Sequence, residues 1–241
     1  MTGQVLEARL QTQGEVWFAS REVGRLADTE SFVLNTALYY ALGLAAGRYV
    51  DTTFEPTYLA DTADVSDRVY VSPAVPISDS GKTNFITSTY NTSDDDYATV
   101  NYSAQEDPDA KKNLPSFGRR RVLGHGNDMR FYLVPREGDA EAIQSRLPKY
   151  VRLGKKRGKV RIETEMQSVK RKSGSYELGH PIGAYDTEQT PVGNLVTKRM
   201  RPTPLVAQAD FEGEYLSFDF ADDDGVSTGL PADVSFLKQK R

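Results

Sequence analysis

The chain has 241 residues, 38% of them hydrophobic, no cysteine and a net charge of −4. The lack of cysteine excludes disulfides, thiolate nucleophiles and zinc–thiolate sites. No apolar run is long enough to span a bilayer and no signal-peptide pattern is present, so we expect a cytoplasmic protein without a membrane partner. Charge is uneven: residues 118–172 carry sixteen Lys or Arg and six Asp or Glu, so an acidic protein can still present one basic surface to a polyanion.

Hydrophobic patterning predicts the elements of the first part of the chain. Imperfect alternation of apolar and polar residues predicts a strand over residues 5–12, which restarts at 16–18, followed by a charged connection over residues 18–28. Apolar residues then recur at spacings of three and four, which predicts a helix that begins after Thr29 or Ser31 and ends before Gly47. The β-branched and aromatic run over residues 68–75 predicts a further strand that ends at Pro76.

The rest of the chain predicts mostly strands. Residues 78–112 are rich in Ser, Thr, Asp and Asn, and we expect them to form a loop or hairpin insertion. The pattern predicts strands over residues 128–135, 149–153, 159–165, 205–209 and 215–220, a short helix over 139–146, a loop-rich stretch over 168–193, and a flexible acidic tail after residue 221. This order predicts one α+β domain, residues 1–241, with an antiparallel sheet and β-hairpin elaborations, for which a ferredoxin-like core is one common plan.

A basic stretch over residues 146–161 is the sharpest signal for function. Cations alternate there with apolar residues around two glycines, and residues two apart in a strand share a face. Cations attract phosphate, glycine lets the backbone approach it, and an exposed tyrosine can stack on a base. The pattern favours nucleic acid, and the alternatives are a solvated basic face or contact with an acidic protein. The candidate RNA-binding residues of this stretch are Tyr150, Arg152, Lys155, Lys156, Lys159 and Arg161.

Two smaller clusters combine arginine with aromatic residues. Phe117, Arg119 and Arg121 suit stacking and phosphate contact, and the alternative is a turn that enters a strand. Arg21 can reach phosphate or form an ion pair with Glu22 or Asp28, and ion pairs of this kind are common.

Catalytic patterns are scarce. His125 lies between glycines in a predicted turn, His180 precedes a proline, and neither has the spacing of a metal motif. Nucleotide-binding loops and calcium-binding loops are also missing. We therefore expect no enzyme, no metal and no cofactor. The alternative is a metal-independent ribonuclease that uses His125 as its general acid or base.

Nine blocks resemble the Csc-one family, the Cas-five-type subunit of the type I-D CRISPR effector complex (Cascade) in the RAMP superfamily. The blocks are WFASREVGRL at residues 17–26, DTE at 28–30, NTALYYALG at 35–43, YVSPA at 70–74, NLPSFGR at 113–119, LPKYVRLGK at 147–155, KVRIE at 159–163, HPI at 180–182 and PTPLV at 202–206. They span most of the chain in the family's order. The long acidic insertion at 78–112 and the basic residues 156–158 depart from the family pattern.

This resemblance implies a fold and a role. The implied fold is an RNA-recognition-like, ferredoxin-like core. The implied role is to hold the 5′ handle of the CRISPR RNA, to cap the filament of repeated backbone subunits, and to contact the large Cas-ten-like subunit. That contact lies near the point where target double-stranded DNA is probed beside its protospacer-adjacent motif. A separate endonuclease processes the RNA in these systems, so the subunit is implied to be non-catalytic. The alternatives are an endoribonuclease that processes precursor RNA and a scaffold that contacts only protein.

Overall fold

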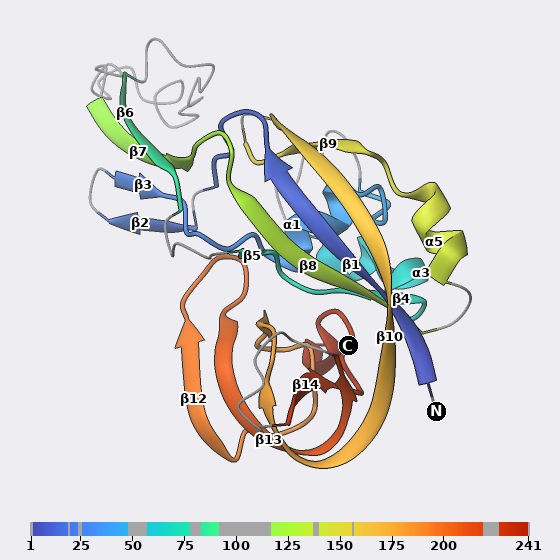
Figure 1. Cartoon of the computed structure of the whole chain (residues 1–241). Coiled ribbons are helices and arrows are strands. Elements are labelled where there is room, and N and C mark those ends of the chain that lie inside the picture. Colours follow the sequence, from blue (N-terminus) through green and yellow to red (C-terminus); the bar gives the residue numbers. More distant parts are fainter. Residues whose placement is uncertain are drawn as a thin grey trace.

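The computed structural model describes residues 2–18, 20–23, 26–47, 57–77, 83–91, 117–136, 140–155, 157–218 and 227–240. Within these residues, ten strands form one large sheet and four form a smaller one. Figure 1 shows the small sheet (β2, β3, β6 and β7) at one end of the molecule and the C-terminal strands curling away from the central sheet. The fold is therefore dominated by sheets with few, short helices.

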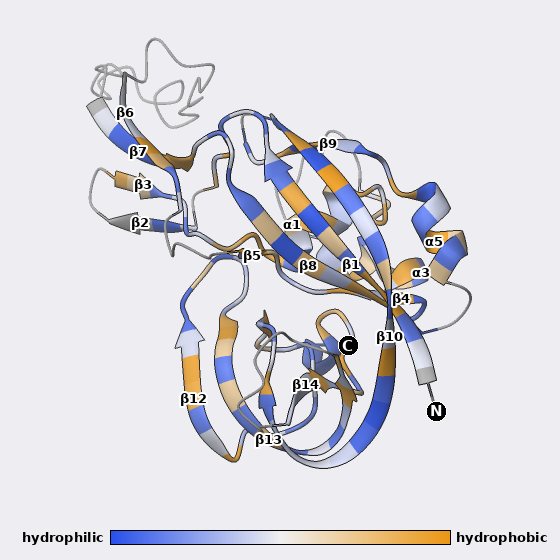
Figure 2. Cartoon of the chain, viewed as in Figure 1, coloured by the Kyte–Doolittle hydropathy of each residue, from blue (hydrophilic) through white to orange (hydrophobic). Residues whose placement is uncertain are grey.

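The centre of the large sheet consists of four antiparallel strands. Their order is β10 (Gly158–Leu178), β1 (Thr2–Thr12), β8 (Asp128–Pro135) and β4 (Val69–Val71). In β1, Leu6, Ala8 and Leu10 are fully buried on one face, whereas Arg9 and Gln11 lie on the other. Figure 2 shows this alternation of apolar and polar residues along the central strands. The strands predicted over 5–12 and 128–135 are confirmed, and in β8 the consecutive residues Phe131 to Val134 are all buried, so both of its faces are covered there.

Short helices pack against the buried face of this sheet. Leu38 and Tyr39 join the same apolar cluster as the buried residues of β1 and β8. The predicted first helix is too long at both ends, because Val33 pairs with Ala74 in a β-bridge and Gly43, at a φ of 72°, follows the last turn. None of the helices in the described part of the chain is long and apolar enough to cross a bilayer. The helices are α1 (Asn35–Ala41), α2 (Tyr58–Asp61), α3 (Ala63–Ser66) and α5 (Ala140–Arg146), of which α5 confirms the short helix predicted over 139–146.

Strand β10 connects the central sheet to the C-terminal strands. β10 is 21 residues long and ends at residue 178. The loop-rich stretch predicted over 168–193 is therefore wrong for residues 168–178. The second half of β10 pairs with β13, and its polar side chains there are exposed, which is why the sequence looked like a loop. The facing pair Gly174 and Gly213 have φ values of 135° and 155°, which favour glycine at this bend. The remaining strands are β5 (Val75–Pro76), β11 (Ile182–Gly183), β12 (Gly193–Lys198), β13 (Leu205–Ser217) and β14 (Thr228–Pro231).

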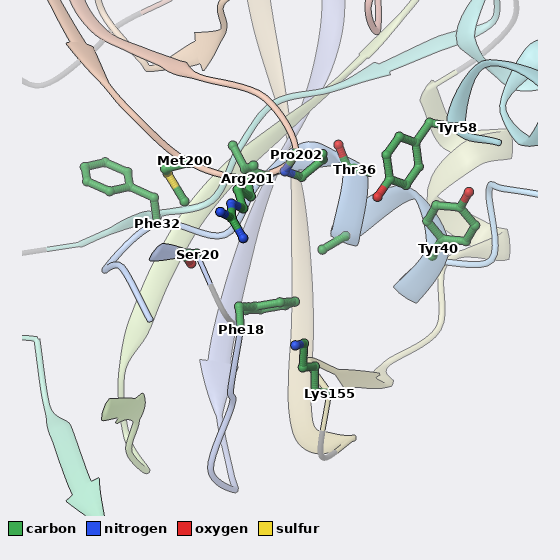
Figure 3. A pocket seen from close by; sticks show the side chains of 12 residues that line it. Phe18, Ser20, Phe32, Thr36, Tyr40, Tyr58, Lys155, Met200, Arg201 and Pro202 are labelled. Atoms are coloured by element: carbon green, nitrogen blue, oxygen red, sulfur yellow. The ribbon is translucent and has the colours of Figure 1, made fainter. Parts of the chain in front are cut away.

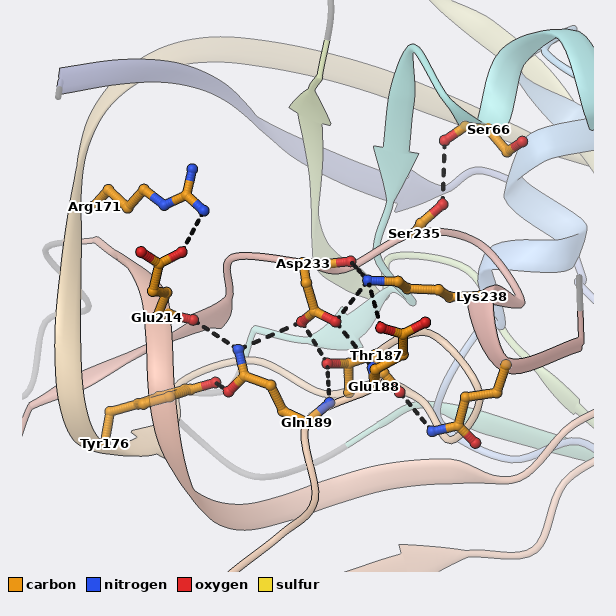
Figure 4. A network of polar contacts seen from close by, with 11 residues as sticks. Ser66, Arg171, Tyr176, Thr187, Glu188, Gln189, Glu214, Asp233, Ser235 and Lys238 are labelled. Atoms are coloured by element: carbon orange, nitrogen blue, oxygen red, sulfur yellow. Dashed lines mark hydrogen bonds and ion pairs between the residues drawn. The ribbon is translucent and has the colours of Figure 1, made fainter.

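The C-terminal segment corrects two predictions. Residues 205–217 form one strand, where two were predicted. Residues 227–240 are packed and not a flexible tail, since Phe236 is fully buried with its ring centre 4.7 Å from that of Tyr39. A polar network also holds this segment, and Figure 4 shows Lys238 reaching Asp233 at 2.9 Å and Glu188 at 3.5 Å. The acidic residues 219–226 lie outside the described part.

The small sheet contains the second basic cluster. Its strands run in the order β2 (Arg21–Val23), β3 (Leu26–Asp28), β7 (Phe117–Leu123) and β6 (Phe85–Asn91). Strand β3 is parallel to β7, and the other pairs are antiparallel. The charged connection predicted over 18–28 is therefore wrong, because β2 pairs with β3, and β3 pairs with β7, which is distant in sequence. Within the predicted insertion, residues 85–91 form β6 of this sheet, and residues 78–82 and 92–112 lie outside the described part.

Candidate nucleic-acid interface

A hairpin of β9 (Tyr150–Leu153) and β10 carries most of the predicted RNA-binding residues. In β9, Tyr150 and Arg152 are exposed, and Val151 and Leu153, which alternate with them, point into the core. The antiparallel register places Lys159 opposite Arg152 and Arg161 opposite Tyr150. Directly opposite residues share a face of a sheet, so these four side chains lie on one face, and their binding of RNA stays a prediction. We call Tyr150, Arg152, Lys159 and Arg161 the hairpin face.

Contacts within the hairpin face leave much of it open to solvent. The ammonium of Lys159 lies 4.4 Å from the centre of the Tyr150 ring, and Tyr150 is 51% exposed. Arg152 donates a hydrogen bond to the carbonyl oxygen of Arg157 at 3.3 Å. Arg161 contacts the Glu163 carboxylate at 2.5 Å, so its charge is partly balanced. The hairpin face thus combines an exposed aromatic ring with cations whose partners are weak or local.

The neighbouring strand β1 sets the limit of the basic region. Arg9 donates two hydrogen bonds to the Asp128 carboxylate, at 2.7 and 3.3 Å, and this interaction raises the pKa of Arg9. Arg9 lies opposite Glu163 in the β1–β10 register. Because positive and negative side chains alternate there, the excess of positive charge is concentrated at the hairpin face.

The two glycines of the β9–β10 loop serve chain packing. A Cβ on Gly154, whose φ is 77°, would lie 2.6 Å from the carbonyl oxygen of Trp17, and one on Gly158 would lie 2.2 Å from that of Glu15. The backbone N–H of Lys155 also donates to the Trp17 carbonyl at 2.8 Å. The predicted role of these glycines, close approach of phosphate, is replaced by close approach of the loop to residues 15–17.

Trp17 links this loop to the small sheet. The ammonium of Lys155 lies 5.3 Å from the centre of the indole, and the guanidinium carbon of Arg120 lies 5.7 Å from it. Arg120 also donates to the Ser88 hydroxyl at 3.0 Å. Trp17 is 6% exposed, so it positions the two cations and is not itself a stacking surface. Arg120 was not among the predicted site residues, since the strand pattern alone does not show which arginine faces the loop.

The cations predicted at Arg21 and Arg121 bind one buried carboxylate. Arg121 donates two hydrogen bonds to Asp28, at 2.6 and 3.0 Å, and Arg21 donates a third at 2.8 Å. Asp28 is 2% exposed, and the guanidinium of Arg121 also lies 4.5 Å from the Phe85 ring. Hydrogen bonding to Asp28, with the charge of Glu30, raises the pKa of Arg21. The ion pair considered for Arg21 with Asp28 is confirmed, so these two arginines stabilise the small sheet.

Three predicted RNA-binding residues remain, namely Arg119, Phe117 and Lys156, and the structure describes the side chain of Arg119 alone among them. Arg119 is exposed on β7, two residues before Arg121 and opposite Leu26. Phe117 begins β7, but its side chain lies outside the described residues, as does the whole of Lys156.

The two histidines have unlike surroundings. His125 is exposed in the turn between β7 and β8. His180 is buried, with Nε2 2.8 Å from the carbonyl oxygen of Pro73, and burial lowers its pKa to about 4. The described part of the chain contains no group of three or more His, Asp or Glu side chains that could hold a metal ion.

Comparisons with known proteins give a match over nearly the whole chain. The family model described as "Type I-D CRISPR-associated protein Cas5/Csc1" matches residues 3–239. None of the curated proteins matches. A chain in "Cryo-EM structure of the Type III-B Cmr-beta bound to cognate target RNA and AMPPnP, state 1" is 10% identical, with a TM-score of 0.49 over 86% of each chain. "Crystal structure of a CRISPR protein from Archaeoglobus fulgidus" is 9% identical, with a TM-score of 0.42 over 95% of this chain and 100% of that one.

Proposed function

Because the chain belongs to the type I-D CRISPR-associated Cas5/Csc1 family, we propose that it is a non-catalytic, RNA-binding subunit of a type I-D CRISPR effector complex. In this proposal it holds the 5′ handle of the CRISPR RNA and caps the filament of repeated backbone subunits. It also contacts the large Cas-ten-like subunit near target double-stranded DNA.

The hairpin face is the observation that supports RNA binding. Its four side chains come from two adjacent strands and present one exposed ring and three cations in the same direction. Single-stranded nucleic acid is bound by this combination, in which bases stack on aromatic rings and phosphates contact cations. Lys155 and the exposed Arg119 extend the proposed RNA path toward the small sheet, while Arg21 and Arg121 support that sheet through Asp28.

The proposed scaffold for this face is a ferredoxin-like core. The succession β1, α1, β4, β8, α5 and β10 has the β-α-β-β-α-β order, and its strands lie side by side in the order β10, β1, β8, β4. All neighbouring pairs in this set are antiparallel. The small sheet then arises from insertions before α1 and before β8, and the C-terminal strands follow the core.

Strand β12 offers a surface for a neighbouring protein subunit. Val192, Leu195 and Val196 are 63%, 54% and 45% exposed at the edge of the large sheet, where β12 pairs with β13. Exposed apolar side chains on an edge strand are typical of protein contacts. This surface lies on other strands than the hairpin face, so RNA and protein contacts can be perturbed separately.

Charge reversal on the hairpin face tests the proposal. The variant Arg152→Glu with Lys159→Glu should bind handle RNA at least about ten-fold more weakly and reduce the log–log salt slope by about 0.7 for each lost phosphate contact. The matched control is Lys170→Glu with Lys172→Glu, which makes the same charge change at exposed positions further along β10. Handle binding that is equal in both variants and in the wild type would overturn the proposal.

Two experiments test the alternative functions, an endoribonuclease and a scaffold that contacts only protein. Cleavage of repeat RNA by the wild type but not by His125→Ala would assign an endoribonuclease. Recovery of the effector subunits without any CRISPR RNA, from cells that express a CRISPR array, would assign a scaffold that contacts only protein.

A further inference from the structure

A hollow of about 580 Å³ lies between α1 and residues 200–202, which follow β12 (Figure 3). Its volume is within the range of about 300 to 1,000 Å³ that is typical of small-molecule sites. Four aromatic side chains, Phe18, Phe32, Tyr40 and Tyr58, line it. Walls of this kind suit a flat ring, since aromatic rings stack or meet edge to face.

Phe18 forms one wall of the hollow, and two hydrogen bonds to Thr29 fix the position of its backbone. The Phe18 backbone N–H donates to the Thr29 hydroxyl oxygen at 3.1 Å, and that hydroxyl donates back to the Phe18 carbonyl at 2.8 Å. Thr29 is fully buried, so this clamp is protected from water. Figure 3 shows the Phe18 ring among the lining side chains, with its far edge beside Lys155.

The polar groups that line the hollow are two cations, the phenols of Tyr40 and Tyr58, and the hydroxyls of the buried residues Ser20 and Thr36. Among the described residues that line it, Lys155 and Arg201 are cationic and none is acidic. The Thr36 hydroxyl oxygen is buried, so the aromatic rings and the two cations are the surface that a ligand meets. Lys155 belongs to the loop that joins the two strands of the hairpin face, so the hollow lies beside the proposed RNA path.

From these features we propose that this hollow, which we call the Phe18 pocket, binds a single unpaired nucleobase of the bound RNA. The inference rests on the proposed function for the source of the base. A nucleotide matches the aromatic and cationic lining, because its base stacks on an aromatic wall and its phosphate faces Lys155 and Arg201. An apolar side chain of a protein partner would use the aromatic walls alone.

Binding of single nucleotides to the full chain tests the pocket directly. With labelled methyl groups, the signals of Ala37 and Met200, which both line the pocket, should shift with at least one ribonucleoside 5′-monophosphate and not with ribose 5-phosphate. Phe18→Leu removes the aromatic face but keeps an apolar side chain, and should weaken this binding about ten-fold. Thr203→Val, at a buried position outside the pocket, should leave it unchanged.

Two outcomes would overturn the pocket assignment. Ribose 5-phosphate that shifts Ala37 and Met200 as the nucleotides do would reduce the site to a phosphate contact. No shift with any nucleotide would exclude a base, and loss of a co-purified effector subunit on Phe18→Leu would then assign the pocket to protein. The two proposals fail separately, because neither Arg152 nor Lys159 lines the pocket. Handle binding that survives their charge reversal would therefore count against the proposed function and leave the nucleotide result standing.

Discussion

Replacing Arg121 with glutamine should destabilise the protein far more than the same change at Arg119, although the sequence assigned both to RNA. Removing one partner of a buried ion pair costs about 3–5 kcal/mol. The lower end applies here, because the Arg121 side chain is 34% exposed and Arg21 still contacts Asp28 at 2.8 Å. The lost contact with the Phe85 ring, 4.5 Å from the guanidinium carbon, adds about 0.5–1 kcal/mol. We therefore expect a loss of about 3–4 kcal/mol.

Denaturant titration of the full chain measures this loss. Arg119→Gln is the matched control, since Arg119 is exposed on the same strand and surface changes of this kind cost less than about 0.5 kcal/mol. Asp28→Asn in the Arg121→Gln background should recover part of the stability, because no buried carboxylate is then left with a single partner. If Arg121→Gln is as stable as the wild type within about 1 kcal/mol but loses RNA affinity, the structural role assigned to Arg121 is wrong.

Three further predictions concern packing and pH. Gly158→Ala should cost more than about 2 kcal/mol because its Cβ would lie 2.2 Å from the Glu15 carbonyl oxygen, whereas Gly126→Ala, which is strained only by its φ of 75°, should cost about 1 kcal/mol; thermal unfolding compares them. Phe236→Ala should cost about 3–5 kcal/mol in denaturant titration, because it empties a fully buried site. The free energy of unfolding should fall by about 2 kcal/mol between neutral pH and about pH 5, because His180 is protonated more easily in the unfolded chain. His180→Gln should remove that part of the pH dependence.

The sign of the His180 effect follows from its pKa. The folded value, about 4, lies below the ordinary value of 6.5, because burial disfavours the charged ring. The stabilisation is therefore complete above pH 6.5 and is lost as the pH falls toward 4. Equal pH profiles for the wild type and the variant would contradict this assignment. An unchanged unfolding midpoint for Phe236→Ala would likewise show that the C-terminal segment is not part of the core.

The family could be read from the sequence, because its blocks are local and keep their order along the chain. The family model confirms that reading over residues 3–239. The hairpin face was also predictable, because alternation in a strand is a local property and the two strands are joined by a short loop. Both features depend on residues close together in the chain, whose geometry is set by the backbone.

The tertiary structure alone decided which partners distant residues would find. Arg121 and Asp28 are 93 positions apart, and only their meeting in the small sheet commits Arg121 to a buried carboxylate. Gly154 and Gly158 were predicted to let the backbone approach phosphate, and the tertiary structure instead packs them against Glu15 and Trp17. The Phe18 pocket and the burial of residues 227–240 arise in the same way, since each gathers side chains from separate segments. Propensity and pattern describe a segment's own preference, whereas these roles depend on the chemistry of a neighbour that the local sequence does not contain.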